Sequence, residues 1–189
     1  MAITTYNDLT AEVKAYCARS DSTFSARFPT FVAMAEERIY HGAGQPSGDP
    51  LFSPPLRTKV LEATATLTTV DGEVTVPDDY NMIRKVVRSS DPTGITYLPP
   101  HRFDTEKVRM GGTLPLYCTV EVDTLKLAPS WDGDLSLYYY KRLAALTQDA
   151  PNNDLLTTHP MVYFNAVMFE AFSFMQDVDL AGGWLAKHN

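Results

Sequence analysis

The residues best placed to do chemistry in this sequence are a histidine and an aspartate that stand three positions apart. His101 and Asp104 occur in HRFDTEK, and this spacing puts both side chains on one face of a helix, as a general acid–base pair requires. The stretch supplies no third group that could orient the histidine or act as a nucleophile. A small hydrolase built on this pair is therefore only an alternative to a protein without an active site.

Other patterns that often carry chemistry have simpler structural explanations here. Asp78 and Asp79 follow Pro77, where acidic residues stabilise the first turn of a helix. GQPSG at 44–48 differs from the GxSxG of a nucleophilic serine, and neither GxGxxG nor GKS/GKT occurs. The four histidines lack the HxxxH type of metal-ligand spacing. They are His41, His101, His159 and His188. We therefore expect no catalytic residues, no metal and no cofactor.

The charge balance argues against a protein whose main task is to hold nucleic acid. The chain has 16 Lys and Arg against 23 Asp and Glu, which gives a formal net charge of -7. Affinity for the phosphate backbone comes from clustered basic side chains. The one basic run, RKVVR at 84–88, alternates along a predicted strand, so its charges divide between two faces. Specific binding of DNA by this protein is therefore disfavoured.

The composition indicates a globular protein with a substantial core. A chain of 189 residues buries roughly 70% of its extended-chain surface when it folds as one domain. Cys17 and Cys118 lack the CxxC spacing, and MAITTYNDL does not have the pattern of a signal peptide. We therefore expect two free thiols in a reducing compartment.

The element around which the chain is organised is an apolar helix predicted over Thr158–Gln176. Its apolar residues form two adjacent stripes, so other elements must cover more than half of its circumference. Asn165 and Glu170 interrupt the apolar run, which makes a membrane span a poor explanation. Phe169 falls in the polar sector, so its ring is expected to be exposed in a single chain and to contact a neighbouring copy.

Two further helices are predicted near the N-terminus. Thr5 and Asp8 have the spacing of a capping box that opens the first helix. The second helix is expected to begin at Phe28-Pro29 and to stop at Gly42. Helices so close in sequence usually pair antiparallel, so both can pack on the C-terminal helix. The predicted three-helix bundle consists of residues 1–42 and 157–189.

Between these helices we predict an inserted antiparallel sheet over residues 56–147. Alternation with a period of two starts at Glu62, and EATATLTTV, Asp71-Gly72 and EVTV have the pattern of a hairpin. The later runs YCTVEV, TLKLAP and DLSLYYYKR predict three strands of a meander. A sheet of about six strands inserted in a helical bundle gives a single α+β domain over residues 1–189.

Two regions are expected to contact partners. In DLSLYYYKR the side chains of Tyr138 and Tyr140 point to the face opposite the core, which makes that face aromatic. Residues 43–55, AGQPSGDPLFSPP, carry four prolines and two glycines, so they form a loop or arm. Leu51 and Phe52 are the apolar anchors that this arm offers to a partner.

The order of these features resembles the head-to-tail connector adaptor (neck) proteins of tailed bacteriophages and related gene transfer agents. The resemblance covers most of the chain and rests on spacing and order, not on a catalytic motif. The Gly/Pro-rich segment at 43–55 and the short stretch LAGGWLAKHN depart from the family pattern, so docking to the portal by a helical tail stays open. The matching stretches are PTFVAMAEERI at 29–39, LRTKVLEATATLTTVDGEVTVPDDYNMIRKV at 56–86, YLPPHRFDTEK at 97–107, LPLYCTVEVDTLKLAPSWDGDLSLYYYKRLAALT at 114–147 and LLTTHPMVYFNAVMFEAFSFMQD at 155–177.

The resemblance implies a structural virion protein without enzymatic activity. It implies a ring of about twelve copies that joins the portal to the tail or nozzle and forms part of the DNA channel used in genome ejection. The implied partners are the portal protein, a tail, nozzle or head-closure protein, and further copies of this chain, with no membrane. The implied location is the neck of the virion after assembly in the host cytoplasm. Another neck or tail-completion protein, such as a head-closure protein or tail terminator, is the first alternative, and the small hydrolase is the second.

Overall fold

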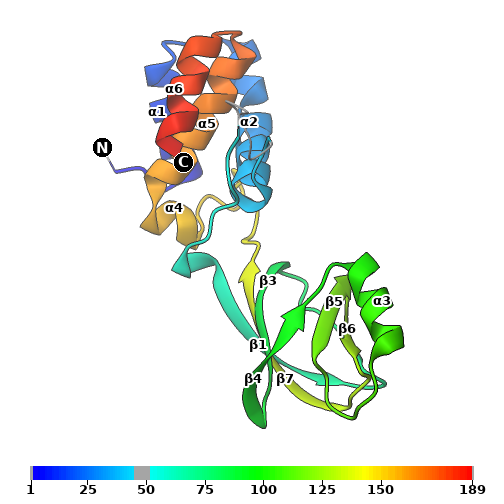
Figure 1. Cartoon of the computed structure of the whole chain (residues 1–189). Coiled ribbons are helices and arrows are strands. Elements are labelled where there is room, and N and C mark those ends of the chain that lie inside the picture. Colours follow the sequence, from blue (N-terminus) through cyan, green and yellow to red (C-terminus); the bar gives the residue numbers. More distant parts are fainter. Residues whose placement is uncertain (1, 45–51, 189) are drawn as a thin grey trace. The chain divides into compact units, whose positions relative to one another are not determined.

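The computed structural model describes residues 2–44 and 52–188, and the chain divides into two compact units. The first, here the helical unit, consists of Met1–Val60 and Leu143–Asn189. The second, here the sheet unit, is the continuous segment Leu61–Arg142. Figure 1 shows helices throughout the first unit, and a curved sheet with one helix in the second.

Within its described residues, the helical unit forms five helices. Four of them, α1, α2, α4 and α6, pack against the fifth, α5. The predicted bundle of three helices is therefore wrong. The apolar faces of α5 need more cover than two partners supply. The helices are α1 (Tyr6–Tyr16), α2 (Ser22–His41), α4 (Asp154–Thr158), α5 (Pro160–Phe174) and α6 (Val178–His188).

Helix α5 is buried on all sides through its middle. All ten residues from Tyr163 to Phe172 are buried, including Asn165 and Glu170, which the sequence pattern placed on a polar side. Met161, an apolar residue near the start of the helix, is 55% exposed. A helix with cover on every side loses the amphipathic pattern that would mark an exposed face.

The starts of α1 and α2 follow capping chemistry. In α1 the predicted capping box is confirmed: the Asp8 N–H donates to Thr5 Oγ1 at 3.2 Å, and Asp8 Oδ2 accepts from the Thr5 N–H at 3.0 Å. Helix α2 begins earlier than predicted, because Asp21 caps it and accepts from the Phe24 N–H at 2.9 Å. Pro29 therefore lies inside α2, and the start predicted at Phe28-Pro29 is wrong.

Gly42 ends α2, as the sequence predicted. Its φ is +72°, a region that residues with a side chain rarely adopt, and its N–H donates to the Arg38 carbonyl at 2.9 Å. A Cβ at this position would lie 2.5 Å from the carbonyl oxygen of Ser53, which is far too close. Glycine is therefore required both by the backbone angle and by the neighbouring chain.

Gly42→Ala is expected to lower the free energy of unfolding by about 1–3 kcal/mol, because the strained backbone and the contact with Ser53 both oppose the folded state. Chemical denaturation of the purified protein measures this. The matched control is Gly182→Ala in α6, where a Cβ would meet nothing within 4 Å and helix propensity should add about 0.5–1 kcal/mol. Equal loss of stability in both variants would contradict the explanation.

The sheet unit forms seven strands and one α-helix within the part of the chain that the structure describes. The sheet order is β1-β7-β3-β4-β5-β6-β2. Every neighbouring pair is antiparallel except β4 and β5, which are parallel, so the sheet is mixed. A 3₁₀ turn, η1 (Lys59–Leu61), precedes the first strand. Helix α3 (Pro100–Arg109) lies between β4 and β5 in the chain and packs on β5 and β6 (Figure 1). The strands are β1 (Glu62–Thr69), β2 (Glu73–Thr75), β3 (Tyr80–Arg88), β4 (Asp91–Tyr97), β5 (Tyr117–Glu121), β6 (Thr124–Ala128) and β7 (Gly133–Lys141).

The sheet curls into a nearly closed barrel. Its two outer strands, β1 and β2, are joined by the turn at Asp71-Gly72, and Val70 and Glu73 exchange backbone hydrogen bonds of 3.1 and 3.0 Å across it. The turn was predicted correctly. The predicted pairing of its two flanking strands as a hairpin is wrong, because β1 pairs with β7 while β2 pairs with β6. Of the predicted meander, the antiparallel pairing of β5 with β6 is confirmed, but the third strand is misplaced, since β7 lies between β1 and β3. The small antiparallel insert is thus replaced by a mixed, seven-stranded barrel.

The barrel interior is filled by alternate residues of the strands. Leu135, Leu137 and Tyr139 of β7 point inward, as the alternation predicted. Both cysteines are free thiols, and Cys118 lies in this core. The buried cluster consists of Val76, Val86, Ile95, Cys118, Leu125, Leu127, Leu135, Leu137 and Tyr139.

Candidate interaction surfaces

The predicted acid–base pair lies on an exposed helix. His101 and Asp104 are both on α3, both side chains are exposed, and no hydrogen bond or ion pair joins them in the described structure. Phe103, between them, points the other way and is buried. The pair therefore has neither the enclosure nor the orienting contact that acid–base catalysis uses.

Of the two acidic residues that follow Pro77, Asp79 anchors the barrel. These residues form a single turn, in which the Tyr80 N–H donates to the Pro77 carbonyl at 2.9 Å, and not the start of a helix. Asp79 Oδ1 accepts from the Tyr139 hydroxyl at 2.8 Å. Burial, and then this hydrogen bond, raise the pKa of Tyr139 to about 12. Asp79 thus fixes a core tyrosine.

In residues 2–44 and 52–188, no group of three His, Cys, Asp or Glu side chains is arranged to hold a metal ion. None of the helices described is long and apolar enough to cross a bilayer.

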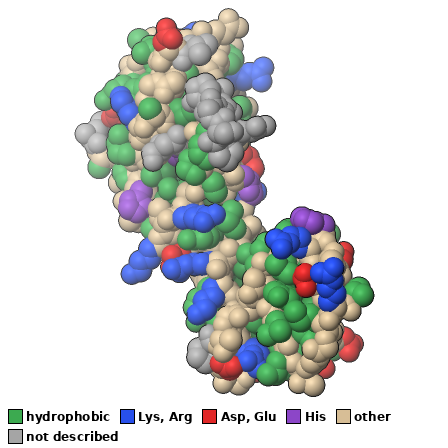
Figure 2. Space-filling model, in the orientation of Figure 1, with side chains coloured by type: hydrophobic (Ala, Val, Ile, Leu, Met, Phe, Trp, Pro, Cys, Tyr) green, Lys and Arg blue, Asp and Glu red, His purple; other side chains and the backbone are tan. Residues whose placement is uncertain are grey.

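The outer face of β7 carries the tyrosines predicted to meet a partner. Tyr138 and Tyr140 are both half-buried on the face opposite the barrel core. Tyr138 lies between Thr64 of β1 and Lys85 of β3, and Tyr140 is paired in register with Glu62 of β1. Figure 2 shows hydrophobic side chains, which here include tyrosine, at the surface of both units between charged ones. This outer tyrosine face keeps aromatic surface available for contact.

Phe169 is not exposed in a single chain. Its side chain is 5% exposed, and the guanidinium of Arg38 lies over the ring, 4.2 Å from the centroid. Arg38 also donates to Glu170 Oε1 at 3.1 Å, and burial raises the pKa of Glu170 while Arg38 opposes that shift. The expectation of a ring left in water is therefore wrong, because α2 covers the sector of α5 that looked polar.

Of the two proposed anchors of the Gly/Pro-rich arm, the structure describes only Phe52. Leu51 lies outside the described residues. Phe52 is half-buried, and its neighbour Ser53 exchanges backbone hydrogen bonds of 2.8 Å with Ala43. The described end of the arm is thus attached beside the end of α2.

A buried glutamate that sequence reasoning missed organises the helical unit. Glu36 is 4% exposed, and its Oε1 accepts from the Leu146 N–H at 2.8 Å and from the Tyr163 hydroxyl at 3.0 Å. Burial, and then the nearby Glu36, raise the pKa of the Tyr163 hydroxyl. The signal was present: Val32, Glu36 and Tyr40 recur every four residues on one buried stripe of α2.

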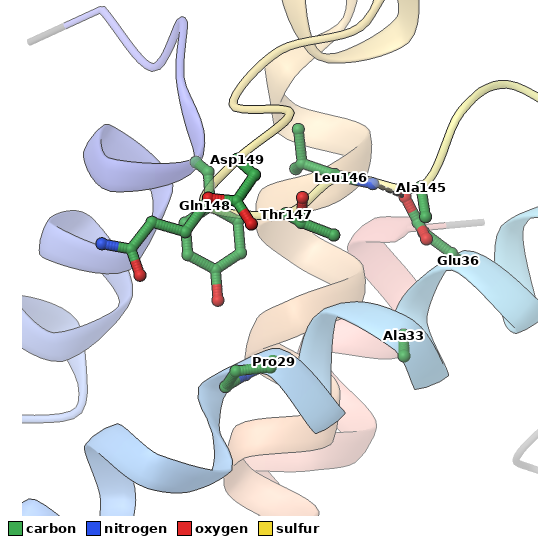
Figure 3. Close-up of a pocket in the computed structure, with 9 residues that line it drawn as sticks. Pro29, Ala33, Glu36, Ala145, Leu146, Thr147, Gln148 and Asp149 are labelled. Carbon is green, nitrogen blue, oxygen red and sulfur yellow. Dashed lines mark hydrogen bonds between the residues drawn. The ribbon is translucent and has the colours of Figure 1, made fainter.

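Glu36 also borders a cleft. Figure 3 shows its carboxylate directed at the segment that begins with Ala145 and Leu146. The cleft has a volume of about 290 Å³ and is lined by Tyr6, Pro29, Ala33, Glu36, Ala145, Leu146, Thr147, Gln148 and Asp149. A second cleft, of about 380 Å³, is lined by Arg27, Thr30, Phe31, Met34, Glu170, Ser173 and Phe174. Met34 and Phe174 are 50% and 41% exposed, so this second surface is partly apolar.

Partly exposed aromatic and apolar side chains, such as Tyr138, Met34 and Phe174, are available on both units for contacts with other proteins. Residues 4–188, nearly the whole chain, match the family described as SU10 adaptor protein, and the chain belongs to that family. It is thus a structural adaptor component of a bacteriophage virion, which associates with other virion proteins. The resemblance drawn from the sequence is confirmed. No curated protein matches the chain.

Proposed function

We propose that the protein joins the portal to the tail or nozzle in the neck of the particle and forms part of the channel through which DNA leaves. The observation that carries this proposal is the family match over residues 4–188. Partly exposed apolar side chains in both units, such as Phe174 and Tyr140, support it, because an adaptor needs surfaces that other subunits can cover. Assembly takes place in the host cytoplasm under this proposal.

The proposed assembly is a ring of about twelve copies, built from one repeated interface. We assign Tyr138 and Tyr140 to contacts with a partner subunit, since the other face of β7, which carries Leu135, Leu137 and Tyr139, is used by the barrel core. Leu51 and Phe52 are assigned to the same class of contact on sequence grounds. Phe169, which is 5% exposed in the single chain, is not assigned to such a contact.

Electron microscopy of the purified protein mixed with its portal tests the function. The expected result is a ring of this protein attached at the tail side of the portal. A protein that bound only a completed tail would instead be a tail-completion protein, and one that bound neither would remove the proposal.

The acidic character of the chain predicts weak contact with the genome. Each copy carries a formal net charge of -7, so a ring would present a largely repulsive wall to phosphate groups. Filter binding at physiological salt is expected to show no tight complex with duplex DNA. Tight, salt-sensitive binding would contradict the passive channel.

A further inference from the structure

Strand β1 is an open edge of the barrel. It pairs with β7 over all eight residues, from Glu62 to Thr69, without a register shift. On its other side, the only backbone pairing in the described structure is that of Val70, just beyond the strand, with Glu73. In an antiparallel strand about half of the residues direct their N–H and C=O groups away from the partner. Most of β1 therefore presents unpaired backbone groups on one side.

This edge lacks the features that usually prevent strand addition. Natural edge strands carry lysine, proline or a bulge, or are very short. Residues 63–69, ATATLTT, contain no charge and no proline, and the pairing with β7 has no bulge. The one charge in the strand, Glu62, is neutralised by Arg84 at 2.7 Å. The opposite edge, β2, has only three residues.

The side chains of β1 suit a further strand. Ala63, Ala65 and Leu67 pack against the barrel core. The alternate residues Thr64 and Thr66 are exposed, and threonine is a β-branched residue that favours strands and pairs well with other hydroxyl side chains. An added strand thus continues an existing surface without covering a charge.

The end of β1 near Thr69 is acidic. Asp71 stands in the turn, Asp132 Oδ1 accepts from the Gly72 N–H at 3.3 Å, and Asp134 Oδ1 accepts from Thr68 Oγ1 at 2.7 Å. All three carboxylates are exposed, and no described basic side chain forms an ion pair with them. A strand that ends here gains from a positive charge.

We propose that β1 accepts an extended segment of another virion protein as an eighth, antiparallel strand of the barrel. The segment is uncharged opposite residues 63–68 and carries Lys or Arg at its N-terminal end, which antiparallel pairing places beside Asp71 and Asp134. The choice of a different protein rests on the proposed function: in a ring all copies point the same way, so two β1 edges cannot meet across a two-fold axis.

The test uses the whole protein with two sets of probes: the full-length portal and nozzle proteins, and overlapping 12-residue peptides that cover both. Wild type is expected to bind peptides of the stated pattern. Thr66→Lys, on the exposed face of β1, should weaken that binding at least tenfold, because an edge lysine opposes strand pairing. Thr96→Lys, an exposed threonine of the inner strand β4, is the matched control and should bind as wild type does.

Two further readouts separate strand addition from other contacts. The amides of residues 63–69 should exchange more slowly when the peptide is bound, and Asp134→Asn should weaken only peptides with a basic N-terminal end. Thermal melting of each variant shows that the fold is retained.

Four outcomes would overturn the proposal. In two of them, binding of full-length proteins but of no peptide, or equal binding by wild type and Thr66→Lys, the proposed function would stand without this edge. A wild-type dimer that Thr66→Lys makes monomeric would assign the edge to a second copy. Failure of wild type to bind any full-length neck protein would remove the proposed function and this inference together.

Discussion

Phe169→Ser is expected to lower the free energy of unfolding by about 3–5 kcal/mol, because it removes a fully enclosed ring and leaves a cavity in the helical unit. The ring is 5% exposed and lies beneath the guanidinium of Arg38. Without it, Arg38 loses a cation–π partner in a place where its charge is largely withdrawn from water. Thermal and chemical denaturation of the purified protein measure the loss.

Phe174→Ser is the matched control for this prediction. Phe174 is on the same helix but is 41% exposed, so the same change should cost about 1 kcal/mol or less. If the two variants lost the same stability, or if Phe169→Ser melted as wild type does, burial of the Phe169 ring would not be what stabilises the single chain.

Glu36→Ala is expected to lower the free energy of unfolding by about 2–5 kcal/mol. The change leaves the Leu146 N–H and the buried Tyr163 hydroxyl without the carboxylate oxygen that both donate to. Because Leu146 belongs to the segment that returns the chain from the sheet unit, its amide should also exchange faster with solvent. Hydrogen exchange and chemical denaturation measure the two effects.

The neighbouring glutamate provides the control. The side chain of Glu37 is 56% exposed and lies 3.5 Å from His41, so Glu37→Ala should change stability by about 0.5 kcal/mol or less. Glu36→Gln keeps one acceptor oxygen and should fall between the two. A Glu36→Ala protein as stable as Glu37→Ala would show that the two hydrogen bonds are not needed.

Local features of the fold could be predicted because local chemistry determines them. A few adjacent residues determine the capping box of Thr5 and Asp8, the end of α2 at Gly42 and the inward-facing residues of β7. The partner with which a strand pairs does not depend on adjacent residues. Alternation shows which face Leu137 occupies, but β1 and β3, which lie on either side of it, come from distant parts of the chain.

The same limit explains the error at Phe169. A helical wheel of α5 places Phe169 between Asn165 and Ser173 and so predicts a polar sector. The structure covers that sector with α2, and the Arg38–Glu170 ion pair makes burial of the carboxylate possible. Neither Arg38 nor the buried Glu36 can be recognised as a partner of α5 from local sequence, since each acts across more than 120 residues.

The division of the chain into one continuous and one split unit affects the order in which it can fold during synthesis. The barrel is complete in sequence at Arg142, before any residue of α5 has been made. Helix α2 has been made long before, but its buried residues Phe31 and Ile39 lie on a face that has to wait for α5. On the ribosome the barrel can therefore fold first, while that apolar face of α2 stays uncovered and open to a chaperone until the last thirty or so residues emerge.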